Sequence, residues 1–295
     1  MISIIVLSKN DELFCSLKKS IIKTIGVPYE IICVPNSDSS FSIFSGYNFG
    51  ANKSKFDYLL FIHEDVIFHT ENWGILLLKY FEDLDNLGVL GIAGSSYLPI
   101  SPSDWWLGNP NYLHANFLSN AKDGRVGGGI PTKWGKQIPV PVFALDGMFL
   151  AIKKIVWEEF RFDENLYGFH GYDTSICYQV SQKYQNYFVP GILMEHFSKG
   201  DPNETWLKNT VIANQLVLPF ILENKKLGFL NSSLEIISYR LFLRQLMKFS
   251  SNTFYKFSMA WYYLLPVLKY TKDLKILIFF FFYSFRYFLQ AIRIK

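Results

Sequence analysis

Short apolar runs alternate with amphipathic segments over the first 93 residues, and this alternation constrains the fold more than any other feature. The apolar runs cover residues 2–7, 30–34, 58–62 and 87–93, and the segments with helical spacing cover residues 11–24, 43–53 and 73–84. Strands that alternate with helices form parallel sheets with right-handed crossover connections. We therefore expect an α/β protein with a mostly parallel, Rossmann-like sheet flanked by helices.

Polar side chains follow the expected strands at one edge of the sheet. Ser8 follows the first strand, Asn36 the second, and Glu64 and Asp65 the third. In open α/β sheets, ligands bind beyond the carboxyl ends of the strands. These residues are therefore the first candidates for a binding site.

Two acids come directly after a buried strand, in the segment His63-Glu64-Asp65. Carboxylates at such a position are costly unless they are solvated, paired or bound to a cation, and hard divalent cations prefer carboxylate oxygens. Asp65 is therefore a candidate metal ligand, and a solvated strand end is the alternative. His196 follows a later strand-like stretch and is either a structural residue or a second ligand. A carboxylate with an imidazole suits Mn²⁺ better than Mg²⁺.

Two further acids are suited to chemistry. Asp173 opens an expected helix over residues 173–183, either as a first-turn acid that stabilises the helix dipole or as a general base toward a sugar hydroxyl. Asp146-Gly147 interrupts the strand-like run 142–152. This interruption is either a bulge or a point where the sugar or acceptor approaches closely.

Residues 99–141 are rich in Gly, Pro, Asn and Trp and show no clear periodicity. Segments of this length without secondary structure are usually functional or disordered. We expect a mobile lid or an acceptor-binding loop in this region.

The charge is distributed unevenly along the chain. Residues 1–224 hold 17 Lys and Arg against 23 Asp and Glu, whereas residues 225–295 hold 12 against 2. We expect a catalytic domain over residues 1–224 and a basic, aromatic helical tail over residues 225–295, in which Arg240, Arg244 and Lys248 share one helix face. Such a tail favours a membrane surface, and packing on the catalytic domain or on a second subunit is the alternative. Without a recognition motif, nucleic acid is not an expected partner.

The N-terminal segment and the cysteines indicate a cytoplasmic protein. The first ten residues lack the basic region and apolar core of a signal peptide, and no apolar run reaches the ~20 residues of a membrane-spanning helix. Cys15, Cys33 and Cys177 form no ligand-spaced cluster, so we expect reduced thiols. The expected location is cytoplasmic and, through the tail, peripheral on the inner face of the cell membrane.

Two motifs carry a resemblance to a known family. Tyr47-Asn48-Phe49-Gly50 precedes Phe61-Ile62-His63-Glu64-Asp65-Val66, which spans the end of the third expected strand. The order of elements and this pair of motifs resemble family 2 glycosyltransferases of the GT-A fold, and most closely the streptomycin-biosynthesis-type branch. The resemblance covers roughly residues 1–200. It implies a GT-A fold, to which this chain adds a C-terminal helical extension.

The resemblance implies roles for individual residues. Asp65 stands in the family's Asp-x-Asp-type motif and would bind the metal, whose coordination His196 would complete. Gly171-Tyr172-Asp173 resembles a Gly-Glu-Asp element whose Asp is the catalytic base, with Tyr172 in place of the Glu. Pro35 and Asn36 stand where the family has a base-binding Asp. We therefore expect Ser8, Asn36, Asn48, His63 and Glu64 at the nucleotide-sugar, and Asp146, Gly147 and Tyr172 at the sugar or acceptor.

These assignments predict a metal-dependent inverting glycosyltransferase. It would use Mn²⁺ or Mg²⁺ to move a sugar from a nucleotide-diphospho-sugar, with UDP as the expected nucleotide, to a hydroxyl of a saccharide or lipid-linked acceptor. Cell-surface polysaccharide or glycolipid synthesis fits the resemblance and the tail. A sugar-phosphate nucleotidyltransferase is disfavoured, because Ser8-Lys9-Asn10 stands where such enzymes have a Gly-rich loop. A non-catalytic nucleotide-sugar-binding or scaffold protein on the same fold is the alternative.

Overall fold

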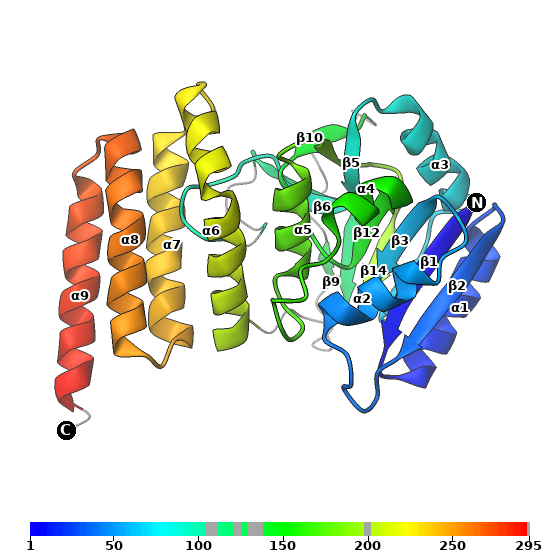
Figure 1. The fold of residues 1–295 in the computed structure, drawn as a ribbon, viewed down its shortest axis with the longest axis horizontal. Helices are drawn as coiled ribbons and strands as arrows, with labels where there is room; N and C mark the ends of the chain where they lie inside the picture. The colour runs from blue at the N-terminus through cyan, green and yellow to red at the C-terminus, as the bar shows by residue number, and fades with distance from the viewer. Residues whose placement is uncertain (104, 106–110, 121–125, 129–137, 198–201, 294–295) are drawn as a thin grey trace.

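The computed structural model describes residues 1–103, 105, 111–120, 126–128, 138–197 and 202–293. Within these residues, seven strands form a central sheet (Figure 1). Their order is β10 (Val140–Val142), β13 (Gln185–Phe188), β5 (Leu87–Gly91), β12 (Phe149–Lys153), β3 (Tyr58–Ile62), β1 (Ile2–Ser8) and β2 (Tyr29–Pro35). The expected mostly parallel sheet is confirmed, since only β10 and β12 among these strands run antiparallel to their neighbours.

Helices cover both faces of this sheet (Figure 1). Helices α1 (Asp11–Thr24) and α3 (Trp73–Asp83) cover one face, and α2 (Ile43–Asn52), α4 (Lys154–Phe160) and α5 (Tyr172–Val180) cover the other. Along β1, Ile4 and Val6 pack with α1 and α3, whereas Ile5 and Leu7 pack with α2. Because successive side chains of a strand point to opposite faces, a sheet buried on both faces requires such continuous apolar runs.

Two smaller sheets complete the strand arrangement. One contains β11 (Ala144–Leu145), β6 (Ala93–Ser95) and β7 (Leu113–Ala115), and the other contains β4 (Val66–Phe68), β14 (Met194–His196), β8 (Phe117–Asn120) and β9 (Val126–Gly128). Strand β14 pairs antiparallel with β4 and places His196 opposite Val66. This pairing brings His196 beside the segment that follows β3.

The structure divides two of the expected strands. The run 87–93 becomes β5 and β6, and the run 142–152 becomes β10, β11 and β12. The last break is a turn in which the Asp146 carboxylate accepts the N–H of Met148 (2.9 Å), a bond typical of aspartate turns. Part of the lid or acceptor loop expected at residues 99–141, namely residues 104, 106–110, 121–125 and 129–137, lies outside the described residues.

Helices α6 (Glu204–Lys226), α7 (Ser232–Phe249), α8 (Thr253–Thr271) and α9 (Lys275–Arg293) follow the last strand and extend away from the sheet, with α9 farthest from it (Figure 1). The side chains of Asn203, Asn231 and Asn252 cap the first three by accepting a backbone N–H from the third helical residue. The expected helical tail is therefore present, and the boundary placed at residue 224 lies inside α6. Across the described part of the chain, no helix combines the length and apolar character that crossing a bilayer requires.

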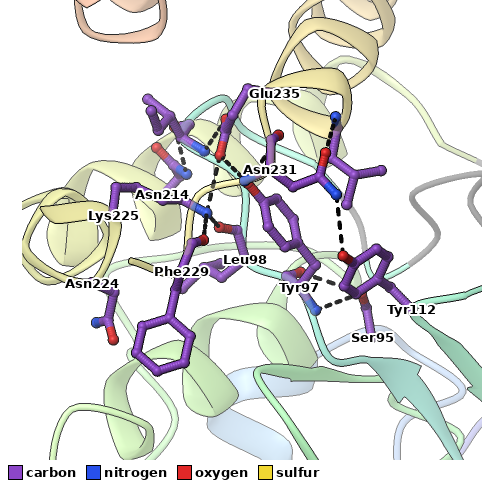
Figure 2. A network of polar contacts seen from close by, with 12 residues as sticks. Ser95, Tyr97, Leu98, Tyr112, Asn214, Asn224, Lys225, Phe229, Asn231 and Glu235 are labelled. Carbon is purple, nitrogen blue, oxygen red and sulfur yellow. Dashed lines mark hydrogen bonds and ion pairs between the residues drawn. The ribbon is translucent and has the colours of Figure 1, made fainter. Parts of the chain in front are cut away.

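A buried ion pair joins the helices to the loop after β6 (Figure 2). Lys225 Nζ lies 3.0 Å from Glu235 Oε1, and both side chains are almost fully buried. Lys225 also donates to the Leu98 carbonyl (2.6 Å). Glu235 accepts bonds from the Tyr97 hydroxyl (2.6 Å) and the Ile100 N–H (2.9 Å). Burial lowers the pKa of Lys225 against the opposing effect of Glu235, so the charge of Lys225 depends on its partner.

Glu235→Ala is expected to lower the free energy of unfolding by about 3–5 kcal/mol, because the ammonium of Lys225 would stay buried without its partner. Urea unfolding followed by circular dichroism measures this change. Glu223→Ala is the control, since Glu223 pairs with Lys226 at the surface and both side chains are exposed. The control should be as stable as wild type, and equal losses in the two variants would contradict the importance of the buried pair.

Candidate metal centre and catalytic site

Two histidines and an aspartate meet at the carboxyl end of β3. His63 and Asp65 lie between β3 and β4, and His196 ends β14. Their ligand atoms all lie within 4.8 Å of one another. Asp65 Oδ1 is 3.4 Å from His196 Nε2 and 3.8 Å from His63 Nδ1, and these two ring nitrogens are 3.4 Å apart. The structure thus brings together the two expected metal ligands, Asp65 and His196, and adds His63 to them.

The chemistry of these three side chains fits a divalent cation. Imidazole nitrogens together with a carboxylate oxygen suit first-row metals such as Mn²⁺. Between 14% and 16% of each side chain is accessible to solvent, so the cluster is sheltered but not closed. An incompletely enclosed site leaves coordination positions for water or for substrate oxygens, as in catalytic metal sites.

Tyr172 holds the ring of His63. The Tyr172 hydroxyl lies 2.6 Å from Nε2 of His63, and the other ring nitrogen, Nδ1, is the one near Asp65. Burial and the charge of His196 lower the pKa of His63 to about 4, so the His63 ring is neutral at pH 7. Metal-binding histidines commonly use their second nitrogen in such a hydrogen bond, which sets the orientation of the ring. His63 was expected at the nucleotide-sugar, and the geometry favours a metal ligand instead.

The contact with His63 also changes the interpretation of Tyr172 and Gly147, which were expected at the sugar or acceptor. The Tyr172 side chain is 4% exposed and its hydroxyl is directed at His63. A Cβ atom on Gly147 would overlap the Tyr172 hydroxyl, so only glycine allows this packing. In this structure the two residues position His63, and any contact with an acceptor stays a prediction.

Asp65 acts on His196 as well. Burial disfavours a charged His196, but the hydrogen bond and the charge of Asp65 outweigh burial and raise the pKa of His196. A proton and a metal ion compete for the same ring nitrogen, because a histidine must be neutral to act as a ligand. Metal affinity is therefore expected to fall as the pH decreases.

Asp173 lies in the first turn of α5. Its Oδ1 accepts the N–H of Thr174 (2.7 Å) and its Oδ2 accepts the N–H of Gly147 (3.2 Å). Burial and the neighbouring carboxylate of Asp146 raise the pKa of Asp173 to about 7. A first-turn acid that served only the helix dipole would gain from being charged. A raised pKa instead suits a general base that works near neutral pH.

Asp146 shares the electrostatic environment of the site. Its Oδ2 accepts the indole N–H of Trp105 (2.7 Å), and its negative charge acts on both Asp173 and His196. The residue pattern did not identify Trp105 as a neighbour of the site. The one signal available was the tryptophan content of residues 99–141.

Ser8 and Glu64, both expected at the nucleotide-sugar, bind each other. Glu64 Oε2 accepts bonds from the Ser8 hydroxyl (2.6 Å) and from the N–H groups of Lys9 and Asn10 (3.0 Å each). These bonds tie the end of β3 to the turn between β1 and α1. In this structure the two residues shape the edge of the sheet, and their contact with a nucleotide stays a prediction.

The two asparagines expected at the nucleotide are also bound by protein. Asn36 exchanges two hydrogen bonds with the backbone of Phe41. Asn48 makes four hydrogen bonds, which reach both backbone groups of Phe162 and the side chains of Glu164 and Trp157. Because an amide side chain offers two donors and two acceptor positions, the Asn48 amide is saturated. In this structure Asn48 fastens α2 to the segment after α4, and its contact with a nucleotide stays a prediction.

Comparisons with known proteins agree with this fold. The sequence matches the family described as "Glycosyltransferase like family" over residues 3–210, which is more than half of the chain. A search of curated proteins found no match. Among solved structures, GalNAc-T7 with UDP, GalNAc and Mn²⁺ has a TM-score of 0.51 at 15% identity, and the match covers 80% of this chain and 54% of that chain.

Two further structures are similar at lower scores. The mannosyltransferase PcManGT from Pyrobaculum calidifontis, in complex with GDP-Man and Mn²⁺, has a TM-score of 0.48 at 11% identity and covers 95% of this chain and 85% of its own. TarS from S. aureus has a TM-score of 0.48 at 12% identity, with 93% of this chain and 50% of that chain covered.

The likeness to GalNAc-T7 establishes the fold alone, because the two sequences are so different, and this chain spans about half the length of that one. The expected GT-A fold is confirmed. The matched residues 3–210 run from β1 into α6 and include His63, Asp65, Asp173 and His196. This chain therefore belongs to the glycosyltransferase-like family.

Proposed function

We propose that the protein is a metal-dependent inverting glycosyltransferase that moves a sugar from a UDP-sugar to a hydroxyl group of an acceptor. The observation that carries this proposal is the His63–Asp65–His196 cluster, which lies at the carboxyl end of the sheet and is joined through Tyr172 to the helix turn that holds Asp173. The site therefore combines the donor set for a cation with a carboxylate that can accept a proton near pH 7.

His63, Asp65 and His196 would hold the cation. When bound, the cation neutralises charge on the departing nucleoside diphosphate. The two imidazole ligands favour Mn²⁺ over Mg²⁺, because Mg²⁺ prefers an all-oxygen shell. GalNAc-T7, which shares the fold, was solved with UDP and Mn²⁺, and this supports the same nucleotide and metal here.

Asp173 would remove the proton from the acceptor hydroxyl while the oxygen of that hydroxyl attacks the anomeric carbon of the sugar. The N–H groups of Gly147 and Thr174 hold its carboxylate in place for this task. A single displacement of this kind inverts the anomeric configuration. Asp146, held by Trp105, is the second carboxylate available to orient the sugar or the acceptor.

The acceptor that we infer is a saccharide or a lipid-linked saccharide in the synthesis of a cell-surface polysaccharide or glycolipid. The narrower resemblance to the streptomycin-biosynthesis-type branch rests on the motifs Tyr47-Asn48-Phe49-Gly50 and Phe61-Ile62-His63-Glu64-Asp65-Val66. The location that fits such acceptors is the cytoplasmic face of the cell membrane, and the basic tail supports it.

Calorimetric titration of UDP, GDP and CMP, with and without Mn²⁺, tests the proposal. We expect UDP to bind in the presence of Mn²⁺ and to bind at least about tenfold more weakly in its absence, since the cation contacts the diphosphate. A preference for GDP would mean that the donor is a GDP-sugar, and the proposed reaction, metal-dependent sugar transfer, would stay the same. Folded protein that binds none of the three nucleotides, or binds them independently of Mn²⁺, would overturn the proposal.

A further inference from the structure

One face of α9 carries a row of large apolar side chains. We call this row the outer stripe of α9; its members are Leu274, directly before the helix, and Ile278, Phe281, Phe282 and Phe285 within it, each between 61% and 68% exposed. They recur every three or four residues, which places them on the same side of the helix. Large contiguous apolar patches are rare on soluble monomers and mark surfaces that bind a partner or a membrane.

The opposite side of α9 packs on the helix bundle. Ile276, Phe280 and Tyr283 are buried in the cluster formed with α7 and α8. Helix α9 thus contacts the bundle through this inner face, and none of the outer-stripe side chains belongs to the buried cluster. Single exposed apolar residues are common on protein surfaces and need no explanation. Five on one side of the same segment form a patch, which is informative.

The outer stripe continues onto α8. Trp261 and Leu265 of α8 are each 52% exposed. The Trp261 ring centroid lies 5.5 Å from that of Phe280, and Phe280 lies 5.8 Å from Phe281 of the stripe. The exposed apolar surface thus spans two neighbouring helices, and it includes a tryptophan, a residue enriched at membrane interfaces.

Basic side chains border the outer stripe. Lys272, Lys275 and Arg286 are exposed at its two ends, and Lys269 is exposed on α8. Residues 225–295 hold 12 Lys and Arg against 2 Asp and Glu. Of the two acids, Glu235 is buried in its pair with Lys225, so Asp273, between Lys272 and Lys275, is the one acid near the stripe. A second copy of the chain docked through this face would bring like charges together, whereas anionic lipid headgroups would complement them.

We propose that the outer stripe of α9, with Trp261 and Leu265, docks on the surface of an anionic bilayer. Helix α9 would lie in the plane of the interface, with its phenylalanines below the headgroups and the basic side chains among them. The absence of a spanning helix in the described part of the chain agrees with this interfacial arrangement. The inference depends on α8 and α9 alone and stands apart from the chemistry proposed for the sheet.

Co-sedimentation of the full chain with vesicles tests this proposal. We expect binding to vesicles of phosphatidylcholine mixed with phosphatidylglycerol, weak binding to pure phosphatidylcholine, and loss of binding as salt is raised. F281Q/F282Q/F285Q should bind at least about tenfold more weakly, and K272E/K275E should lose about fivefold or more for each charge reversed. I75Q/I155Q is the control, since these isoleucines are 53% and 72% exposed outside the stripe, and it should bind like wild type.

Two outcomes would overturn the proposal. One is wild-type protein that stays monomeric and binds no anionic vesicles, or whose stripe variant binds as well as wild type. The other is a wild-type dimer that F281Q/F282Q/F285Q converts to a monomer, because a second copy would then cover the stripe. The assay contains no nucleotide or metal, so its failure is distinct from failure of the proposed transfer reaction, which the calorimetric titration reports.

Discussion

Asp65→Asn is expected to lower sugar transfer by about 10³-fold or more while the protein stays folded. Asp65 is the one carboxylate in the cluster with His63 and His196. The asparagine has the same shape but carries no charge, so it is a much weaker ligand for Mn²⁺ and leaves the leaving group with less charge stabilisation. A direct Mn²⁺ titration measures the loss of metal affinity. Transfer rates at several Mn²⁺ concentrations, up to saturation, measure the loss of charge stabilisation at the leaving group.

Asp57→Asn is the matched control for this experiment. Asp57 is exposed and directly precedes β3, at the end of the strand opposite to Asp65, so the same chemical change is made away from the site. The control should keep wild-type activity and Mn²⁺ affinity. A folded Asp65→Asn protein with wild-type activity would refute the metal role of Asp65.

Asp173→Asn is expected to lower kcat by about 10²–10⁴-fold, the usual contribution of a general base. The amide cannot accept the proton of the acceptor hydroxyl, whereas binding of the nucleotide-sugar should change little. Calorimetric titration of UDP with Mn²⁺ separates these two effects, because it reports binding without turnover. Weaker UDP binding with kcat unchanged would contradict the assignment of Asp173 as the base.

The pH dependence provides a second test of Asp173. Burial and Asp146 raise its pKa to about 7, and the base is active only when ionised. At saturating Mn²⁺, the wild-type rate should therefore fall about tenfold per pH unit below about pH 7, and the residual rate of Asp173→Asn should not show this fall. Ionisation of this buried carboxyl opposes folding, so it lowers the free energy of unfolding of the wild-type protein progressively as the pH rises from about 4 to about 7. Asp173→Asn does not ionise and should therefore be at least as stable as wild type at pH 8.

Asp11→Asn controls for the helix dipole. Asp11 is an exposed first-turn acid of α1, as Asp173 is a first-turn acid of α5. If Asp173 served only its helix, the two substitutions would have similar small effects on stability and none on the pH profile of kcat.

The elements whose signals are local could be predicted from sequence. Helix α1 runs over residues 11–24 and β3 over residues 58–62, as expected, because apolar spacing and flanking polar residues mark both. Asn10 caps α1 with two hydrogen bonds, and Asp11 opens its first turn. Within residues 142–152, Asp146-Gly147 marked the break before β12, whereas the break between β10 and β11 has no local signal and depends on which strands lie beside them.

The candidate site could be predicted only by residue type. Asp65 and His196 were suited to a metal, but they meet through the pairing of β4 with β14, and such long-range pairing leaves no local signal. His63 and His196 stand 133 positions apart in the chain. The hydrogen bonds that use all positions of the Asn48 amide, and the bond between Tyr172 and His63, could not be predicted either, because their partners come from distant segments.

Docking through α9 would hold the metal cluster at a distance from the bilayer that the order of the helices determines. Helix α6 follows the sheet, α7 packs on α6, and α9 packs on α7 and α8 at the far end of the molecule (Figure 1). With packed helices about 8–10 Å apart, two spacings place α6 about 16–20 Å from α9. Strand β3, which leads into His63 and Asp65, lies on the side of α6 away from α9 (Figure 1). A protein resting on its α9 stripe would hold its active centre well above the lipid. If the proposed docking holds, a lipid-linked acceptor would have to extend from the bilayer across this distance to reach Asp173.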